Sequence, residues 1–296
     1  MSSEAEKSNN SAPATPPPYF WGDMPEEEYY TSQGVRNTKS YFETPNGKLF
    51  TQSFLPLDGE IKGTVYMSHG YGSDTSWMFQ KICMSFCNWG YAVFAADLLG
   101  HGRSDGIRCY LGDMEKVAAT SLCFFKHVRD SEPYKHLPAF LFGESMGGYE
   151  AKQDSPFSLT VSSLAWLIRG LQCRIIRWLG RQSMIRKSSR SLQLTHKGKP
   201  RVGTMRELLR KTLYVQENFG RVTAPFLTVH GTADGVTCPS SSKLLYEKAS
   251  SDDKTLKLYD GMYHSLIQGE PDENVAIVLK DMREWIDERV ERYGSK

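Results

Sequence analysis

The chain has 296 residues, enough to bury the core of one large α/β domain. Its composition, 40% apolar and 24% charged, is that of an ordinary globular protein, and a formal net charge of +2 gives no argument for nucleic acid as a partner. No segment approaches the length of a membrane span and the first residues contain no apolar leader, so we expect a cytoplasmic protein.

The N-terminal part is predicted to contain a tail and a hairpin. Residues 1–20 are rich in Ser, Asn, Ala and Pro, and this composition predicts disorder because it buries too little apolar surface. Runs at 40–43 and 49–54 flank Asn46-Gly47, a dipeptide typical of two-residue turns between antiparallel strands. The first regular structure is therefore predicted to be a β-hairpin.

Beyond the hairpin, short apolar runs alternate with amphipathic stretches. The predicted strands are 63–68, 91–97, 137–140, 225–231 and 255–259. One predicted helix begins near Ser73 or Asp74 and ends before Gly90, others span 113–129 and 240–248, and a C-terminal helix starts at Pro271-Asp272. This alternation predicts a mostly parallel sheet with helices on both faces.

The pattern Gly143-Glu144-Ser145-Met146-Gly147 follows the predicted strand 137–140. It fits G-x-S-x-G, in which a strand turns sharply into a helix and a serine hydroxyl stands above the sheet. Glycines on both sides of the serine allow the tight bend and a close approach of helix and strand. A bare match also occurs by chance, so the interpretation of Ser145 as a nucleophile depends on its partners.

Two partner residues follow in the chain. Asp234 and His264 each lie in a loop after a predicted strand, at the sheet edge where α/β proteins form their sites. The order Ser145, Asp234, His264 is that of the α/β-hydrolase triad. A serine hydroxyl needs a base within hydrogen-bond reach and a third group that orients the base. We therefore expect Ser145 to attack an acyl carbon, His264 to transfer the proton and Asp234 to hold the imidazole.

The charge that develops on the acyl oxygen needs hydrogen-bond donors, and two backbone N–H groups are candidates. Met146 lies at the start of the helix after the serine. Tyr71 lies in the loop His69-Gly70-Tyr71-Gly72, which leaves the strand 63–68. We expect these two N–H groups to form the oxyanion hole.

Simpler interpretations exist for several of these residues taken one at a time. Asp234 before Gly235 fits a turn, and His69 and His101 in their glycine-rich loops are expected to be structural hydrogen-bonding residues rather than catalysts. The serine motif, its two partners and the oxyanion loop nevertheless agree in chain order and in their position after strands. This agreement favours the hydrolase interpretation.

Five segments carry a resemblance to a known family. They are residues 69–72, 97–106, 143–148, 230–239 and 261–265. With them the chain resembles the monoacylglycerol-lipase-like α/β-hydrolases of the serine aminopeptidase S33 type, and among these it is most similar to the plant caffeoylshikimate esterases. The resemblance extends over about residues 20–148 and 198–293.

The resemblance implies the α/β-hydrolase fold and a carboxylic ester hydrolase that splits caffeoyl shikimate into caffeate and shikimate in lignin precursor synthesis. Monoacylglycerol or lysophospholipid hydrolysis is the alternative. Ser145, Asp234 and His264 match the family triad, and Tyr71 and Met146 match its oxyanion-hole positions. The family implies a small-molecule ester as substrate and neither a metal nor an organic cofactor.

The six cysteines add no sign of a metal site. They show neither a C-x-x-C pair nor a zinc-ligand spacing, and several lie in apolar segments, where we expect buried thiols in a reducing compartment. The sequence does not indicate an oligomeric state.

The segment 149–198 departs from the family. In the family, an apolar helix, a central strand and a helical cap follow the position of Gly148, whereas here Pro156 is expected to stop the helix. Residues 152–199 contain ten Lys or Arg and one acidic residue, a local net charge of +9. Because the segment is also shorter than the family's insert, we expect the cap to be abnormal or truncated and, in one reading, a core strand to be missing.

Three interpretations of this segment stay open. It could be a basic amphipathic element that contacts an anionic membrane surface, or a rearranged cap. We favour a third, a coding sequence misread through a frame shift or mis-joined exons, because the composition changes abruptly on both sides. Re-translating the nucleotide sequence over residues 149–198 tests it, and finding no family-like helix, strand and cap in the other frames would reject it.

The predicted organisation follows from these observations. It comprises a Pro/Ser-rich tail (1–20), the N-terminal part of an α/β-hydrolase domain (21–148), an atypical basic cap or insert segment (149–198) and the C-terminal part of that domain (199–296). Two alternatives to an active esterase remain because of the altered segment. One is a receptor-like hydrolase fold that binds a small ligand, and the other is a non-functional isoform.

Overall fold

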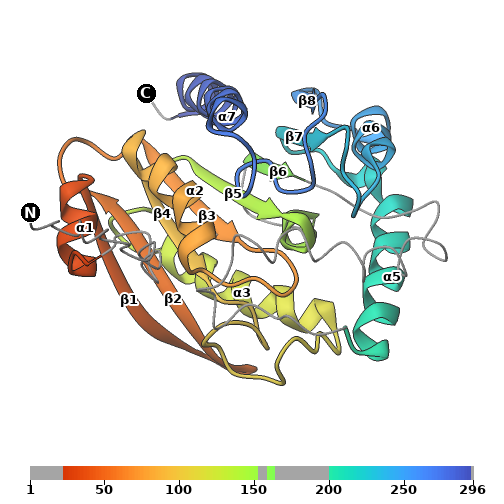
Figure 1. Ribbon diagram of the computed structural model, residues 1–296, viewed down its shortest axis with the longest axis horizontal. Helices are drawn as coiled ribbons and strands as arrows, with labels where there is room; N and C mark the ends of the chain where they lie inside the picture. The colour runs from red at the N-terminus through yellow and green to blue at the C-terminus, as the bar shows by residue number, and fades with distance from the viewer. Residues whose placement is uncertain (1–22, 153–158, 164–199, 295–296) are drawn as a thin grey trace, which may run out of the picture.

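A computed structural model describes residues 23–152, 159–163 and 200–294. Within these residues an eight-stranded sheet has the order β1-β2-β4-β3-β5-β6-β7-β8 (Figure 1). The strands are β1 (Val35–Thr44), β2 (Gly47–Pro56), β3 (Gly63–Ser68), β4 (Tyr91–Ala96), β5 (Ala139–Glu144), β6 (Leu159–Ser163), β7 (Phe226–Gly231) and β8 (Lys254–Tyr259). β2 pairs antiparallel with β1 and with β4, and the other pairings are parallel, so the mostly parallel sheet is confirmed.

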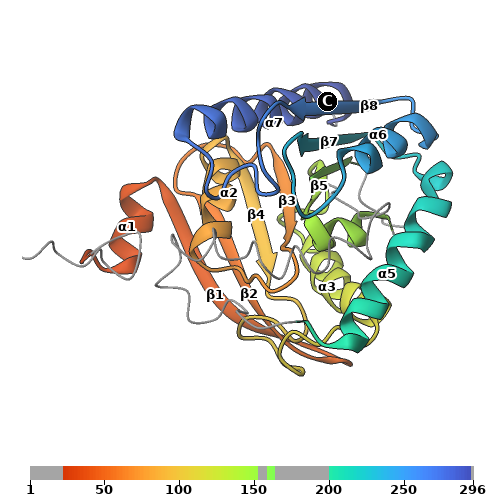
Figure 2. The same cartoon turned by 45° about the vertical axis from the view of Figure 1, so that its right-hand side comes forward.

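Helices cover both faces of this sheet, as predicted (Figures 1 and 2). The α-helices are α1 (Glu26–Ser32), α2 (Trp77–Asn88), α3 (Met114–Arg129), α5 (Val202–Glu217), α6 (Pro239–Lys248) and α7 (Asp272–Tyr293), and the 3-10 helices are η1 (Ser145–Lys152) and η2 (Phe219–Arg221). The core on one face joins α2 and α7, and the core on the other joins α3, η1 and α6.

The strands separate these two cores by simple alternation. Val65 and Met67 of β3 lie in the core under α2 and α7, whereas Tyr66 between them lies in the core under α3. Both faces of β3, β4 and β7 are buried. Parallel strands covered on both faces contain near-continuous apolar runs, which is why these strands were recognisable in the sequence.

The hairpin is present, but its turn is displaced by one residue. Thr44 pairs with Gly47, so the two residues in the turn are Pro45 and Asn46 rather than Asn46 and Gly47. The side chain of Thr44 stabilises this turn, because its hydroxyl donates to the carbonyl of Gly47 at 2.6 Å and accepts from the N–H of Asn46 at 3.2 Å.

The expected loss of a core strand is contradicted. β6 lies between β5 and β7 and pairs parallel with both. The five residues Leu159–Ser163 therefore belong to the sheet, although they fall in the segment that the sequence assigned to a cap or insert. The tail that was predicted to be disordered and the greater part of the altered segment lie outside the described residues, so those predictions stay untested.

Two helix starts show how local side chains set the ends. α2 begins at Trp77, later than the predicted Ser73 or Asp74, because the carboxylate of Asp74 accepts a hydrogen bond from the N–H of Ser76 in a turn before the helix. α3 begins at Met114 as predicted, and the side chain of Asp113 caps it by accepting from the N–H of Glu115 at 2.9 Å.

The sequence analysis missed α5. Its buried residues are mainly polar (Thr204, Glu207, Lys211, Thr212 and Val215), so the apolar periodicity that reveals an amphipathic helix is weak. Contacts with α3 hold it instead. Glu207 accepts the backbone N–H of Met114 at 3.1 Å, and the ammonium of Lys211 pairs with Glu115.

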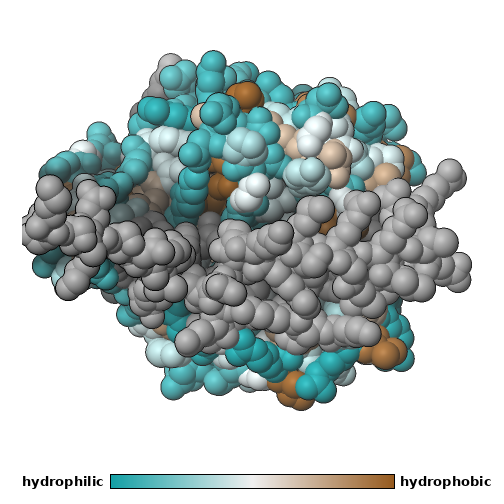
Figure 3. Space-filling model, in the orientation of Figure 1, coloured by the Kyte–Doolittle hydropathy of each residue, from teal (hydrophilic) through white to brown (hydrophobic). Residues whose placement is uncertain are grey.

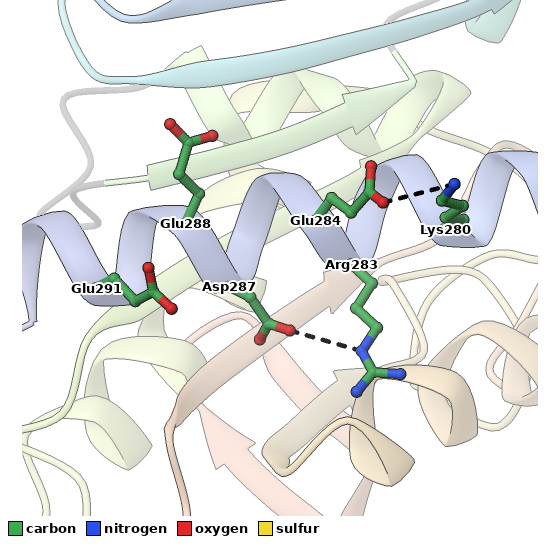
Figure 4. A pocket seen from close by; sticks show the side chains of 6 residues that line it. All are labelled: Lys280, Arg283, Glu284, Asp287, Glu288 and Glu291. Atoms are coloured by element: carbon green, nitrogen blue, oxygen red, sulfur yellow. Dashed lines mark ion pairs between the residues drawn. The ribbon is translucent and has the colours of Figure 1, made fainter.

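The described surface visible in Figure 3 is mainly hydrophilic, with apolar residues scattered over it. A shallow hollow on α7 is lined by charged side chains, two pairs of which interact along the helix: Lys280 with Glu284 at 3.7 Å and Arg283 with Asp287 at 3.5 Å (Figure 4). These i,i+4 pairs are typical of a solvated helix face. Among the described residues, no helix is long and apolar enough to cross a membrane.

A carboxylate just before β8 binds two side chains of the C-terminal helix, and we expect its removal to weaken the fold. Asp253, just before β8, accepts hydrogen bonds from the buried guanidinium of Arg289 and, at 3.0 Å, from the hydroxyl of Tyr293. We expect Asp253→Asn to lower the free energy of unfolding by about 2 kcal/mol at pH 7, measured by urea denaturation. Asp252→Asn is the matched control, because Asp252 is exposed.

The same pair of variants gives a pH test. Burial by itself raises the pKa of Asp253, but the hydrogen bonds from Arg289 and Tyr293 and the charges of Arg289 and Arg292 outweigh it and lower that pKa. A carboxyl with a lowered pKa stabilises the folded state above its unfolded pKa of about 3.9, and this contribution is lost as the pH falls through the folded pKa. The deficit of Asp253→Asn should therefore shrink in acid, and a deficit independent of pH would contradict this account.

Candidate active site

Ser145 stands at a sharp turn between β5 and η1. Its φ of +51° lies in the left-handed region that side chains rarely adopt. The backbone is closely packed on both sides of the serine, because a Cβ built on Gly143 would lie 2.6 Å from the Cα of Gly148 and one on Gly147 would lie 2.3 Å from the carbonyl oxygen of Ser68. The structure thus has the strand, turn and helix start that the G-x-S-x-G pattern predicts.

The close contact between Gly147 and β3 leads us to expect that a larger residue at position 147 would reduce both stability and activity. We expect Gly147→Ala to lower the free energy of unfolding by about 2 to 3 kcal/mol, since the new methyl group must displace the backbone of Ser68. Ester hydrolysis should fall at least 10²-fold, because a displacement of about 1 Å at a reacting group has that effect. Gly220→Ala is the control: its Cβ would have one neighbour within 4 Å, at 3.8 Å, and thermal unfolding should be unchanged. Equal stability of the two variants would contradict the close approach.

The three residues predicted to form the triad are brought together at the carboxyl edge of the parallel strands. The Nε2 atom of His264 lies 3.2 Å from the Oγ atom of Ser145, and its Nδ1 atom lies 2.8 Å from the Oδ2 atom of Asp234. Ser145 lies in the turn after β5, Asp234 in the loop after β7 and His264 in the loop after β8. Since parallel strands end at one edge of the sheet, side chains distant in the sequence meet there.

The carboxylate of Asp234 is fully buried and surrounded by donors. Its Oδ1 atom accepts the N–H groups of Val236 at 2.7 Å and Thr237 at 2.9 Å. Its Oδ2 atom accepts from His264, from the hydroxyl of Thr237 and from His230, whose Nε2 atom lies 3.0 Å away. Burial alone would raise the pKa of Asp234, but the hydrogen bonds from His230, His264 and Thr237 outweigh it and hold the pKa well below its ordinary range.

His264 has a second acidic neighbour. Burial lowers the pKa of the imidazole, but the hydrogen bond and charge of Asp234, together with the charge of Glu144, raise it above the ordinary value. Glu144 precedes the serine and accepts a hydrogen bond from the hydroxyl of Ser265 at 3.1 Å. Burial raises the pKa of Glu144, and the charge of His264 opposes that rise. The imidazole therefore lies between two carboxyl groups and is suited to hold a proton.

Tyr71 and Met146, the predicted oxyanion-hole residues, lie on backbone next to the serine hydroxyl. Met146 directly follows Ser145 in η1. A Cβ built on Gly70 would lie 3.3 Å from the Cβ of Ser145, so the loop that carries Tyr71 runs alongside the serine. The hydroxyl of Tyr71 donates a hydrogen bond to the carbonyl of Cys109 at 3.0 Å. Their role as oxyanion donors stays a prediction.

His69 and His101 make structural hydrogen bonds, as the sequence analysis expected. Both are buried. The Nδ1–H of His69 donates to the carbonyl of Gly70 at 2.8 Å, while its Nε2 atom accepts the N–H of Leu98 at 3.0 Å. These bonds join the loop that carries Tyr71 to the loop after β4.

Asp97 completes this junction between the two loops. Its Oδ1 atom accepts the N–H and the hydroxyl of Thr75, both at 2.6 Å, and its Oδ2 atom accepts the N–H of Arg103 at 2.9 Å. The resemblance singled out residues 97–106 without giving them a role. The structure explains the motif as a buried support for the loop beside the serine.

Four residues around the triad received no role from the sequence: Glu144, His230, Thr237 and Ser265. Each lies within a matched motif, so the signal was present, but which atoms meet depends on how the loops fold. His230 had the plainest signal, because an imidazole at the end of a buried strand needs polar partners.

The strand order and the strand, turn and helix start that carry Ser145 define the class of this protein, an α/β-hydrolase. The family model described as serine aminopeptidase, S33, matches residues 59–153 and 154–272, which is more than half of the chain. This chain therefore belongs to the serine aminopeptidase S33 family of hydrolases.

Individual relatives agree with the family. The caffeoylshikimate esterase of Arabidopsis thaliana is 69% identical over an alignment of 330 residues that covers 100% of this chain and 99% of that protein. The monoglyceride lipase of Rattus norvegicus is 28% identical and covers 84% of this chain and 89% of its own length. A soluble variant of monoglyceride lipase from Saccharomyces cerevisiae, solved in complex with a substrate analog, has a TM-score of 0.72 at 18% identity, with 87% of this chain and 96% of that chain covered. The last similarity supports the fold alone.

Proposed function

We propose that this protein hydrolyses caffeoyl shikimate to caffeate and shikimate, with Ser145 as nucleophile, His264 as general base and acid, and Asp234 as the group that orients the imidazole. The identity of 69% to a caffeoylshikimate esterase over the full length of both chains carries the choice of substrate. The contacts from Ser145 to His264 and from His264 to Asp234 support the roles of the residues.

The reaction proceeds in two halves. The Oγ atom of Ser145 attacks the ester carbon while its proton passes to the Nε2 atom of His264, and the N–H groups of Tyr71 and Met146 bind the oxygen that becomes negative. When the ester bond breaks, His264 protonates the leaving shikimate hydroxyl and the caffeoyl group stays on Ser145. Water then attacks this acyl-enzyme, giving its proton to His264, and caffeate is released as Ser145 is protonated again.

The substrate is tested by comparing catalytic efficiency on several esters. We expect kcat/KM of the purified protein to be highest for caffeoyl shikimate, with a monoacylglycerol and a lysophospholipid as competitors. A tenfold preference for the monoacylglycerol would replace this proposal with the second candidate, which the similarity to the rat monoglyceride lipase supports. Binding of caffeoyl shikimate without turnover would instead favour the receptor-like alternative.

Location and partners are part of the proposal. We infer a cytoplasmic enzyme that acts on a small-molecule ester, and contact of the basic segment 149–198 with an anionic membrane is the alternative location. Co-sedimentation with vesicles that contain phosphatidylserine tests this contact. Sedimentation that 0.5 M salt does not reverse would exclude a purely electrostatic contact.

A further inference from the structure

A second histidine, His230, contacts the carboxylate that holds His264. Its Nε2 atom lies 3.0 Å from the Oδ2 atom of Asp234, the same oxygen that accepts from His264 at 2.8 Å. The side chain of His230 is 1% exposed, so this contact is dry. A buried imidazole on the triad carboxylate has no part in the reaction derived above.

The neighbours of His230 indicate which of its ring nitrogens donates a hydrogen bond and which accepts one. A carboxylate only accepts hydrogen bonds, so the proton of this contact belongs to the Nε2 atom of His230. The Nδ1 atom lies 2.8 Å from the hydroxyl of Ser242 on α6, and a hydroxyl can donate to it. With the Nε2–H donated to Asp234 and the Nδ1 atom accepting from Ser242, both ring nitrogens have a hydrogen-bond partner.

The contact holds Asp234 to the strand that precedes its own loop and, through Ser242, to α6. His230 lies in β7, which pairs with β6 and β8, and its partner Ser242 lies on α6. His264 instead lies on the loop after β8, and its ring is 23% exposed. His230, in a strand that is paired on both sides, thus contacts the same carboxylate oxygen as His264, which lies on a loop.

We propose that His230 is a positioning residue: it donates its Nε2–H to Asp234, fixes the orientation of that carboxylate and, by sharing its Oδ2 atom, limits how strongly Asp234 stabilises protonated His264. This inference rests on the proposed function of the triad. When His230 no longer donates, more of the charge on Asp234 acts on His264, which then keeps its proton to a higher pH.

The other titratable groups that face His264 must stay unchanged for this effect to be visible. They are Asp234, after β7, and Glu144, at the end of β5. Glu144 accepts its own hydrogen bond, from Ser265. A change at His230 therefore reaches His264 through Asp234 and through the hydroxyl of Thr237, which lies 3.5 Å from the Nε2 atom of His230 and 3.2 Å from the Nδ1 atom of His264.

The test compares two variants of His230. His230→Leu removes the donor by replacing the imidazole with an apolar side chain of similar size. The amide of His230→Gln, in contrast, can both donate to Asp234 and accept from Ser242. We expect the acid limb of kcat/KM against pH, measured on a chromogenic ester, to move upward by about half a unit in His230→Leu, with a roughly tenfold lower kcat. His230→Gln should restore the position of the limb.

Two further measurements keep the proposal falsifiable. Ser242→Ala should move the limb in the same direction by less, and the exposed control His136→Leu should not move it. Titration of the His264 ring by nitrogen NMR measures the same shift without turnover. If the wild type is inactive, the proposed function is overturned, and the NMR titration of His230→Leu still decides this inference. If neither the acid limb nor the titration of the His264 ring moves in His230→Leu, His230 only packs in the core and the proposal is overturned.

Discussion

Replacing Ser145 by alanine should lower kcat for ester hydrolysis by about a million-fold while the protein stays folded. In the proposed mechanism the hydroxyl oxygen bonds to the acyl carbon, and removal of the nucleophile from a serine–histidine–aspartate triad has an effect of this size. Burst release of a chromogenic alcohol measures it, because the acyl-enzyme forms once per active chain before steady turnover.

The strained backbone of Ser145 provides a control that separates chemistry from folding. At φ +51° glycine is relaxed and alanine is not, so Ser145→Gly should be more stable than Ser145→Ala by about 1 kcal/mol while being equally inactive. Circular dichroism melts of both variants measure this difference. If Ser145→Ala kept more than a few percent of the activity, another nucleophile would be responsible and the proposed mechanism would be wrong.

Replacing Asp234 by asparagine should have the second-largest effect, a fall in kcat of about 10⁴-fold. The carboxylate accepts from Val236, Thr237, His264 and His230, and an amide must turn its NH₂ group toward some of these donors. Turned toward His264, the amide selects the wrong tautomer of the imidazole, in which the Nε2 atom carries the proton and cannot accept one from Ser145.

The pH profile adds a second readout for Asp234. Asp234 raises the pKa of His264, so wild-type kcat/KM should fall as the pH drops through that raised pKa and the imidazole becomes protonated. In Asp234→Asn the acid limb should move to lower pH, since the charge that favours protonated His264 is gone. A profile unchanged in position would show that Asp234 does not act on His264. The exposed Asp252→Asn serves as the control.

The hypothesis of a misread coding sequence gains support from the relatives, although its test lies in the nucleotide sequence. The alignment with the Arabidopsis esterase covers 330 positions against 296 residues here, so about 34 positions of that protein (330 − 296) have no counterpart in this chain. The match to the family model is also divided between residues 153 and 154, within the segment that departs from the family. Sequencing the transcript across residues 149–198 would decide whether a longer form exists.

Much of the fold could be predicted from the sequence because its signals are local. The apolar runs gave β3, β4 and β7, the cap Asp113 gave the start of α3, and Pro271-Asp272 marked the start of α7. Each of these features depends on residues a few positions apart, so the backbone conformation follows from the side chains nearby. Two predicted boundaries were wrong, the position of the hairpin turn and the start of α2. They depend on single hydrogen bonds made by the side chains of Thr44 and Asp74.

The order of serine, aspartate and histidine after successive strands is a property of the sequence alone, and it determined the fold class and the candidate residues. Only the tertiary structure decided that a strand, β6, completes the sheet, that the mainly polar face of α5 packs on α3, and that His230 and Glu144 flank the triad. The physical reason is distance along the chain. Strand pairing, burial and electrostatic coupling involve residues that are far apart in the sequence. A local sequence pattern therefore does not predict which of their atoms will be in contact.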